Sequence, residues 1–270
     1  MRRLWLLFAV ALLIVSGGVQ AASPTPVIVE LFTSEGCSDC PPADALLDTL
    51  IARPPLAGVD IIGLGQHVDY WDRQGWKDRF SSAALTHRQQ LYQARFSTAS
   101  IYTPQMVVDG RAEFVGSDAG AARRAIERSR AAPHGVVQID LMPVGAELAP
   151  PGRADQGRPL HVAVSVTGLP PLGRGDRADL IVAVTESGLR TEVTRGENHG
   201  RTLTHAAVVR HMAAIGQVAS DGAASASASA DIPLASDWQR DRLTVVAFVQ
   251  ELRGRTILAS ASVRLKNARP

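Results

Sequence analysis

The two cysteines of this 270-residue chain stand three positions apart, as Cys37-Ser38-Asp39-Cys40, and the chain has no others. A mostly apolar, β-branched run at 26–33 precedes them, and Pro41-Pro42 and then leucines at helical spacing follow them. Proline is tolerated in the first turn of a helix, and such an apolar run is typical of a buried strand. The sequence therefore predicts strand, Cys-x-x-Cys and helix in direct succession, with both sulfurs where the helix begins.

The pattern continues through the first half of the chain. Residues 59–65 predict a second strand, and serines 81 and 82 can cap a helix that runs to about Phe96. The pair Asp109-Gly110 predicts a hairpin between 105–108 and 112–115, and a last helix is expected over 118–131, capped by Ser117. We therefore expect a β-α-β-α-β-β-α domain over residues 26–132.

From residue 135 onward the apolar residues alternate without helical periods. Strands are expected at 136–141, 160–166, 180–184, 243–249 and 257–265. The Ala/Ser alternation at 221–231 buries little apolar surface and predicts a mobile loop. The second half is therefore expected to be an all-β, sandwich-like domain over 135–268.

The N-terminus predicts export. Arg2 and Arg3 precede an apolar run at 4–15, and small residues near Ala21 suit a signal peptidase, so residues 1–21 are interpreted as a signal peptide. We expect a secreted protein of the bacterial periplasm, without a membrane span in the mature chain. Loss of both arginines would leave 26 basic and 26 acidic residues, a balance that gives no reason to expect nucleic acid as a partner.

The order of elements resembles the thioredoxin fold. In that fold the proline at the position of Pro104 is cis and lies against the cysteine pair, where its strand meets a substrate peptide. The segments 30–42, 67–72 and 102–108 further resemble a secreted bacterial family catalogued as domain of unknown function 1223, and the resemblance includes 196–205. Two departures from thioredoxin stand out, because Leu31 replaces its buried carboxylate and Gly36 its aromatic residue.

The predicted chemistry is thiol–disulfide exchange with cysteine-containing proteins or a redox partner. A helix N-terminus favours the thiolate of Cys37, although Asp39 and Glu35 oppose it. Cys37 would be the nucleophile and Cys40 would resolve the mixed disulfide, while Thr103 and Pro104 position the partner. No organic cofactor is required. This interpretation depends on sulfurs that can be reached from solvent.

A polar and aromatic cluster follows the second strand. His67, Asp69, Tyr70 and Trp71 are expected to shape a substrate groove beside Cys37, since ligands bind at strand ends in open α/β sheets. The alternative is that Tyr70, Trp71 and Trp76 pack a domain interface.

Two other functions stay open at this point. In the first, the cysteines form an inert disulfide in a non-enzymatic envelope binding module. In the second, they bind copper with His67 or Met106 as a third ligand. A metal site at His199, His205 and His211, which recur every six residues, is disfavoured because co-ligands are not in register.

Overall fold

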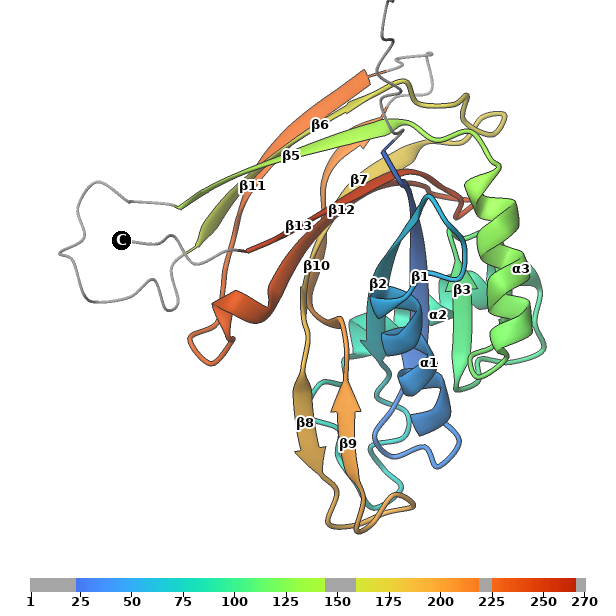
Figure 1. The fold of residues 1–270 in the computed structure, drawn as a ribbon, viewed down its shortest axis with the longest axis vertical. Helices are drawn as coiled ribbons and strands as arrows, with labels where there is room; N and C mark the ends of the chain where they lie inside the picture. The colour runs from blue at the N-terminus through green and yellow to red at the C-terminus, as the bar shows by residue number, and fades with distance from the viewer. Residues whose placement is uncertain (1–22, 144–158, 219–224, 266–270) are drawn as a thin grey trace, which may run out of the picture.

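The computed structural model describes residues 23–143, 159–218 and 225–265 (Figure 1). The predicted signal peptide, residues 1–21, lies outside them. The helices are α1 (Pro41–Ala52), α2 (Ala83–Phe96), α3 (Ala119–Arg130) and the short 3-10 helix η2 (Arg240–Arg242). The strands are β1 (Thr25–Thr33), β2 (Val59–His67), β3 (Gln105–Val108), β4 (Ala112–Val115), β5 (Val136–Pro143), β6 (Leu160–Thr167), β7 (Ala178–Glu186), β8 (Leu189–Glu192), β9 (Thr202–His205), β10 (Val208–Val218), β11 (Ser225–Ile232), β12 (Leu243–Glu251) and β13 (Ile257–Arg264). In the described part of the chain, no helix is long and apolar enough to cross a membrane.

One mixed sheet of eight strands runs through both halves of the chain, in the order β13-β12-β7-β10-β2-β1-β3-β4. β1 is parallel to β2 and antiparallel to β3. A single bridge between Gly65 of β2 and Val208 of β10 joins the two halves of this sheet. The strands of the expected second domain therefore extend the sheet of the first.

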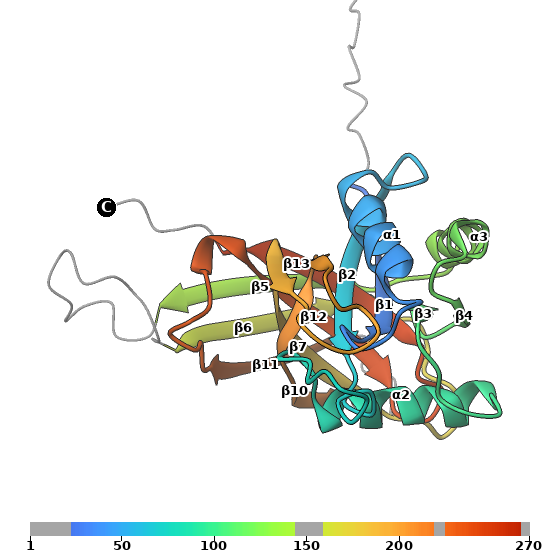
Figure 2. The same ribbon diagram turned by 90° about the horizontal axis from the view of Figure 1, so that it is seen from below.

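Alternation along β1 decides which helix covers which face of this sheet. Val27, Val29 and Leu31 belong to one apolar cluster with α1 and α3, whereas Ile28 faces the cluster that includes Leu85 of α2. Figure 2 shows α1 and α3 on one side of the sheet and α2 on the other. Strand residues point alternately to the two faces, so β1 is buried on both.

A second, three-stranded sheet, β11-β6-β5, completes the β-rich half. Its inward side chains share an apolar cluster with those of β7 and β12, and the two sheets pack face to face as in a sandwich. The prediction of a loop at 221–231 is wrong for the described part of that segment, since β11 pairs with β6 from Ser225 to Ile232. The alanines at 226, 228 and 230 face the cluster. The alternation of small apolar and polar side chains is therefore enough for a strand here, although no inward side chain among these is large.

A buried ion pair links α2 to the sheet. Arg88 donates from Nε to Glu30 of β1 at 2.6 Å, and both side chains are nearly inaccessible. Burial alone would raise the pKa of Glu30, but the charge and hydrogen bonds of Arg88 lower it below its ordinary value. Gln250 of β12 accepts a further hydrogen bond from Arg88 at 2.9 Å, so this polar cluster also ties the two halves together.

Several local predictions are confirmed. Ser82 caps α2 by accepting from the amide of Ala84, and the Asp109-Gly110 turn joins β3 to β4. The Thr103–Pro104 peptide bond is cis. The cap of α3 is Asp118 rather than Ser117, because the Asp118 carboxylate reaches the amide of Ala121 at 2.8 Å.

Replacing Gly110 with alanine should destabilise the protein by at least about 3 kcal/mol. Its φ of +62° is strained for any L side chain, and a Cβ there would overlap the backbone carbonyl of Arg255. Gly58→Ala is the matched control, since its φ is +72° but nothing lies within 4 Å of the new Cβ. It should cost only about 1 kcal/mol. Urea unfolding would measure both, and equal losses would refute the steric explanation.

Candidate functional site

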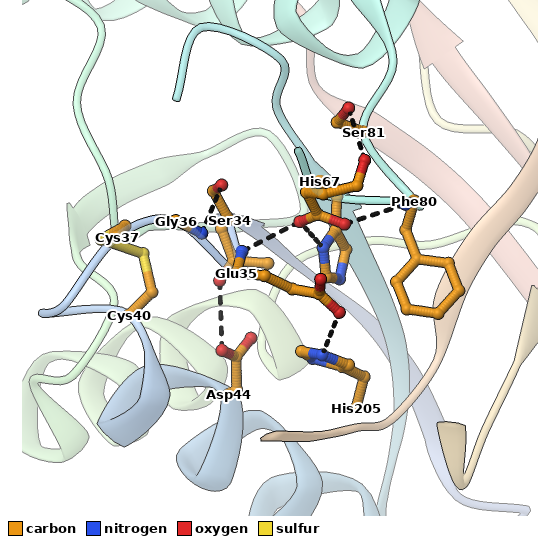
Figure 3. Close-up of polar contacts among 12 residues, drawn as sticks. Ser34, Glu35, Gly36, Cys37, Cys40, Asp44, His67, Phe80, Ser81 and His205 are labelled. Carbon is orange, nitrogen blue, oxygen red and sulfur yellow. Dashed lines mark hydrogen bonds and ion pairs between the residues drawn. A yellow bond between two sulfur atoms is a disulfide. The ribbon is translucent and has the colours of Figure 1, made fainter. Parts of the chain in front are cut away.

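The two cysteines form a disulfide where α1 begins (Figure 3), with their Cα atoms 5.4 Å apart. Cys40 is the N-cap residue of α1, and its carbonyl oxygen accepts from the amides of Ala43 and Asp44. Pro41 opens the helix, where its missing N–H leaves no bond unmade. The predicted succession of strand, cysteine pair and helix is confirmed.

The expectation that the sulfurs are open to solvent is wrong. Cys37 is 1% exposed and Cys40 is fully buried. The loop between β8 and β9 packs against the backbone that carries them: Asn198, itself fully buried, donates to the carbonyl oxygens of Glu35 and Cys37 at 2.9 Å. Beside it, the Glu197 carboxylate accepts from the amide of Ser38 at 3.1 Å. A segment some 160 residues further along the chain therefore closes the site that the local sequence would leave open.

Trp71 and Thr103 lie on another side of the cysteine loop. The indole N–H of Trp71 donates to the hydroxyl of Thr103 at 2.8 Å, and a Cβ at Gly36 would meet that of Trp71 at 3.3 Å. The cis Pro104 is buried near the first turn of α1, because a Cβ at Gly116 would touch both Pro104 and Ala43. The structure thus brings Trp71, Thr103 and Pro104 together around the start of α1.

Other members of the predicted groove serve the interior instead. Tyr70 packs, with Trp71, against an apolar cluster around Phe32 and Tyr92. Asp69 is half-buried and accepts from the hydroxyl of Thr86 at 2.6 Å. His67 is 1% exposed. Three of the five expected substrate-binding residues therefore stabilise the strand ends, and Tyr70 and Trp71 pack within the first half of the chain rather than at an interface between the expected domains.

Two carboxylate–imidazole pairs are buried behind the disulfide. His67 Nδ1 lies 2.6 Å from Asp78, and His205 Nε2 lies 3.1 Å from Glu35. The two rings meet edge to face with centroids 4.8 Å apart, while Trp76 donates to the second oxygen of Glu35 at 2.9 Å. His67 Nε2 and His205 Nδ1 have no hydrogen-bond partner. In each histidine, therefore, one ring nitrogen is paired and the other is buried without a partner.

The electrostatics of the first pair favour a charged state. Burial alone would lower the pKa of His67, but the charge and hydrogen bond of Asp78 raise it above its ordinary value. Burial likewise would raise the pKa of Asp78, but His67 and the backbone amides of Glu35 and Phe80 lower it. The two residues stabilise each other as an ion pair inside the fold.

Asp44 completes this set of acid–base groups. It stands one helical turn after Cys40, the N-cap residue of α1. Figure 3 shows it between Cys40 and His205, and the Thr33 hydroxyl donates to it at 3.2 Å. Burial raises the pKa of Asp44 to about 6, although His205 and His67 oppose the rise. A carboxyl group that can hold a proton near neutral pH thus lies beside the cysteine pair.

Replacing Asp44 with asparagine should stabilise the protein above pH 6, by up to about 3 kcal/mol, and should change nothing near pH 4. The folded protein holds the Asp44 proton up to a pH of about 6, whereas the ordinary pKa is 3.8. Protons are therefore taken up on folding in this window, and wild-type stability falls as pH rises through it. Urea unfolding from pH 4 to 8 would measure the effect. Asp48→Asn, on the exposed side of the same helix, is the control; parallel profiles for all three proteins would contradict the prediction.

The geometry does not favour the metal sites considered from sequence. Among the residues that the structure describes, no group of three or more His, Cys, Asp or Glu side chains could hold a metal ion. Met106 packs in the core with Leu31, and the sulfurs of Cys37 and Cys40 are bonded to each other. His205 ends β9, whereas His211 lies within the separate strand β10, so the three histidines spaced by six do not share one strand.

Sequence reasoning missed Asn198, Asp44 and the carboxylate pairs. Asp44 follows Cys40 at helical spacing, which could have marked it as the nearest acid to the second sulfur. The segment 196–205 stood out only as part of the family resemblance. Glycines 196 and 200 suggested a loop, and both have positive φ. Nothing in the local sequence places that loop on the cysteine pair.

Comparisons with known proteins agree with this fold. The chain is similar to a protein of Agrobacterium tumefaciens solved by crystallography, with 22% identity and a TM-score of 0.65 over 93% of this chain and 99% of that one. It is also similar to HBP35 of Porphyromonas gingivalis, with 15% identity and a TM-score of 0.61 over 92% of this chain and 78% of that one. At these identities the likeness concerns the fold alone.

No curated protein matches the chain. The model of one family matches residues 28–250, a span that contains the cysteine pair, the cis proline and the β8–β9 loop over them. The chain therefore belongs to the family described as protein of unknown function (DUF1223).

Proposed function

We propose that this protein is a thiol–disulfide oxidoreductase whose redox centre is the Cys37–Cys40 pair, carried on a thioredoxin-like domain over residues 26–132. The observation that carries the proposal is the acid–base group Asp44, which is partly buried one helical turn after Cys40, at the helix N-terminus that holds the disulfide. A disulfide that only crosslinks the chain needs no proton donor, and burying ionisable groups lowers stability. Groups with shifted pKa values cluster at sites of chemistry.

The exchange balances as follows. A thiolate of the partner attacks the sulfur of Cys37, the Cys37–Cys40 bond breaks, and Cys40 leaves as a thiolate that takes a proton from Asp44. The second thiolate of the partner then attacks the mixed disulfide and releases Cys37. The partner ends as a disulfide and both cysteines as thiols, while the two protons lost by the partner supply Cys37 and restore Asp44. The reverse sequence oxidises the cysteines. Cysteine-containing proteins are the proposed substrates.

The burial of both sulfurs adds a condition to this mechanism. A partner thiolate must reach the sulfur of Cys37 along the S–S axis, but Cys37 is only 1% exposed and Asn198 is bonded to its carbonyl oxygen. We therefore include in the proposal a displacement of the β8–β9 loop before exchange. Export to the periplasm, an oxidising compartment, remains part of the proposed setting on the strength of residues 1–21.

The reduction potential of the cysteine pair tests this function. The purified protein would be equilibrated with glutathione or dithiothreitol couples at pH 7, and the thiol content read by alkylation and mass. A redox-active pair should have a potential above roughly −300 mV, since structural disulfides lie below about that value. A pair that stays oxidised below this limit would contradict the proposal.

That contrary outcome would support the second candidate, a binding module in which the disulfide is structural. The complete burial of Cys40 and the hydrogen bonds of Asn198 over the pair favour it. In this case both cysteine variants would lose stability by about 2–5 kcal/mol but would keep any partner.

A further inference from the structure

A hollow lies on the α2 side of the sheet, along α2 and β10. Its volume is about 550 Å³, in the range of sites for small molecules. The N-terminal half of α2 forms one wall and residues 209–214 of β10 form the other, with Ile181 of β7 and Arg255 of the β12–β13 turn between them. The cysteines do not line it. We call this hollow the α2–β10 groove.

The groove exists because the sheet is weakly joined at this point. β2 and β10 share only one bridge, at Gly65 and Val208, while α2 packs over β1 and β2. The sheet surface beyond β2 is therefore only partly covered by the helix. Pockets form preferentially at such junctions between structural units.

The floor and rim of the groove are apolar. Leu85, Ile181 and Val209 are buried at its base, and Met212 is partly buried beside them. Leu91 at the rim is 37% exposed. A ligand with an apolar body would bury this surface at roughly 25 cal/mol per Å².

The charged side chains that line the groove are all basic. They are Arg88, Arg210 and Arg255, and no Asp or Glu lines the groove. Arg88 is paired with Glu30, and Arg210 with Glu186. The groove therefore favours a negatively charged ligand over a positive one.

Arg255 is the cation whose bonds are least complete. It is 7% exposed and donates from Nη2 to Gln250 at 3.0 Å, but its Nε has no hydrogen-bond partner. No ion pair within 4.0 Å joins it to a carboxylate of the described residues. Burial and the charge of Arg88 lower its pKa, while Tyr92, Glu30 and Asp179 oppose this. A bound anion would supply the missing partner.

We propose that the α2–β10 groove binds a single-chain amphipathic carboxylate, with its alkyl chain over Leu85, Ile181 and Val209 and its carboxylate at Arg255. This site is independent of the cysteine pair, so its test does not depend on the redox proposal.

Titration of the full folded protein with sodium dodecanoate, below its micelle concentration, tests the site by calorimetry. Saturable one-to-one binding is expected. Ala84→Trp fills the groove, since Ala84 lines it, and should weaken binding at least tenfold. Ala83→Trp is the matched control, because Ala83 is an exposed neighbour on the same helix that does not line the groove. No saturable binding, or equal loss in both variants, would overturn the proposal.

The preference of the groove for a negative head group is tested first on the wild-type protein and then on one variant. Dodecanoate should bind at least tenfold more tightly than dodecyltrimethylammonium, and the Arg255→Gln variant should bring the two affinities together. Equal affinities in the wild-type protein would overturn the assigned charge. Anionic vesicles provide the last comparison: sedimentation of the protein with them, in the absence of dodecanoate binding, would assign the face to a membrane surface and refute a free amphiphile.

Discussion

A Cys40→Ser variant should accumulate a mixed disulfide at Cys37, whereas a Cys37→Ser variant should accumulate none. In the first variant no second thiol remains to displace the bound partner, and in the second the attacked sulfur is missing. With oxidised glutathione in excess, most of the Cys40→Ser protein should carry one glutathione. Less than about a tenth of the Cys37→Ser protein should do so, because the sulfur assigned as the one attacked is then missing.

Intact-mass measurement would read this difference directly. The variant that lacks both cysteines is the control for adducts elsewhere, and it should stay unmodified. Similar adduct levels on the two single variants would show that the sulfurs are equivalent, and no adduct on either would show that the pair is inert. Both results contradict the assigned roles of Cys37 and Cys40.

An Asn198→Ala variant should speed reduction of the disulfide by dithiothreitol about tenfold or more. The side chain of Asn198 donates two buried hydrogen bonds to the backbone around Cys37. Each such bond contributes about 0.5–1.5 kcal/mol, and 1.4 kcal/mol changes an equilibrium tenfold. If the β8–β9 loop must open before the reductant enters, the loss of these two bonds raises the population of the open loop by that factor.

The neighbouring residue offers a matched control. His199 is exposed in the same loop, and its one hydrogen bond there is made by its backbone, so His199→Ala should reduce at the wild-type rate. Unfolding midpoints of both variants would confirm that the global fold is kept. An unchanged rate for Asn198→Ala would mean that the β8–β9 loop does not limit access to the sulfurs.

The elements that the sequence predicted are those with strong local signals. The β-branched run of β1, the proline at the start of α1 and the Asp109-Gly110 turn each determine their structure within a few residues. The mixed α/β character and most strand positions follow from such signals. The strand β11 was missed because alanine and serine have weak strand propensity, and its pairing with β6 decides its conformation.

The candidate site was only partly predictable, because it is made by contacts between distant segments. The cysteine pair was found from its spacing, and Thr103 and Pro104 from the resemblance to the thioredoxin fold. The closure by Asn198 and the pairing of Glu35 with His205 each join residues more than 160 positions apart. No periodicity or turn signal carries such information, and for this reason the expected exposure of the sulfurs was wrong. His67 was predicted to bind a ligand, but its Nδ1 is paired with the carboxylate of Asp78.

The position of Asn198 in the chain has a consequence for biosynthesis. The cysteines precede Asn198 by about 160 residues. At roughly 5–20 residues per second, they leave the ribosome on the order of ten seconds or more before the hairpin that will shield them exists. If the chain is exported as proposed, enzymes that oxidise nascent proteins would meet two accessible thiols during that interval, whereas after folding the same enzymes would meet a buried disulfide.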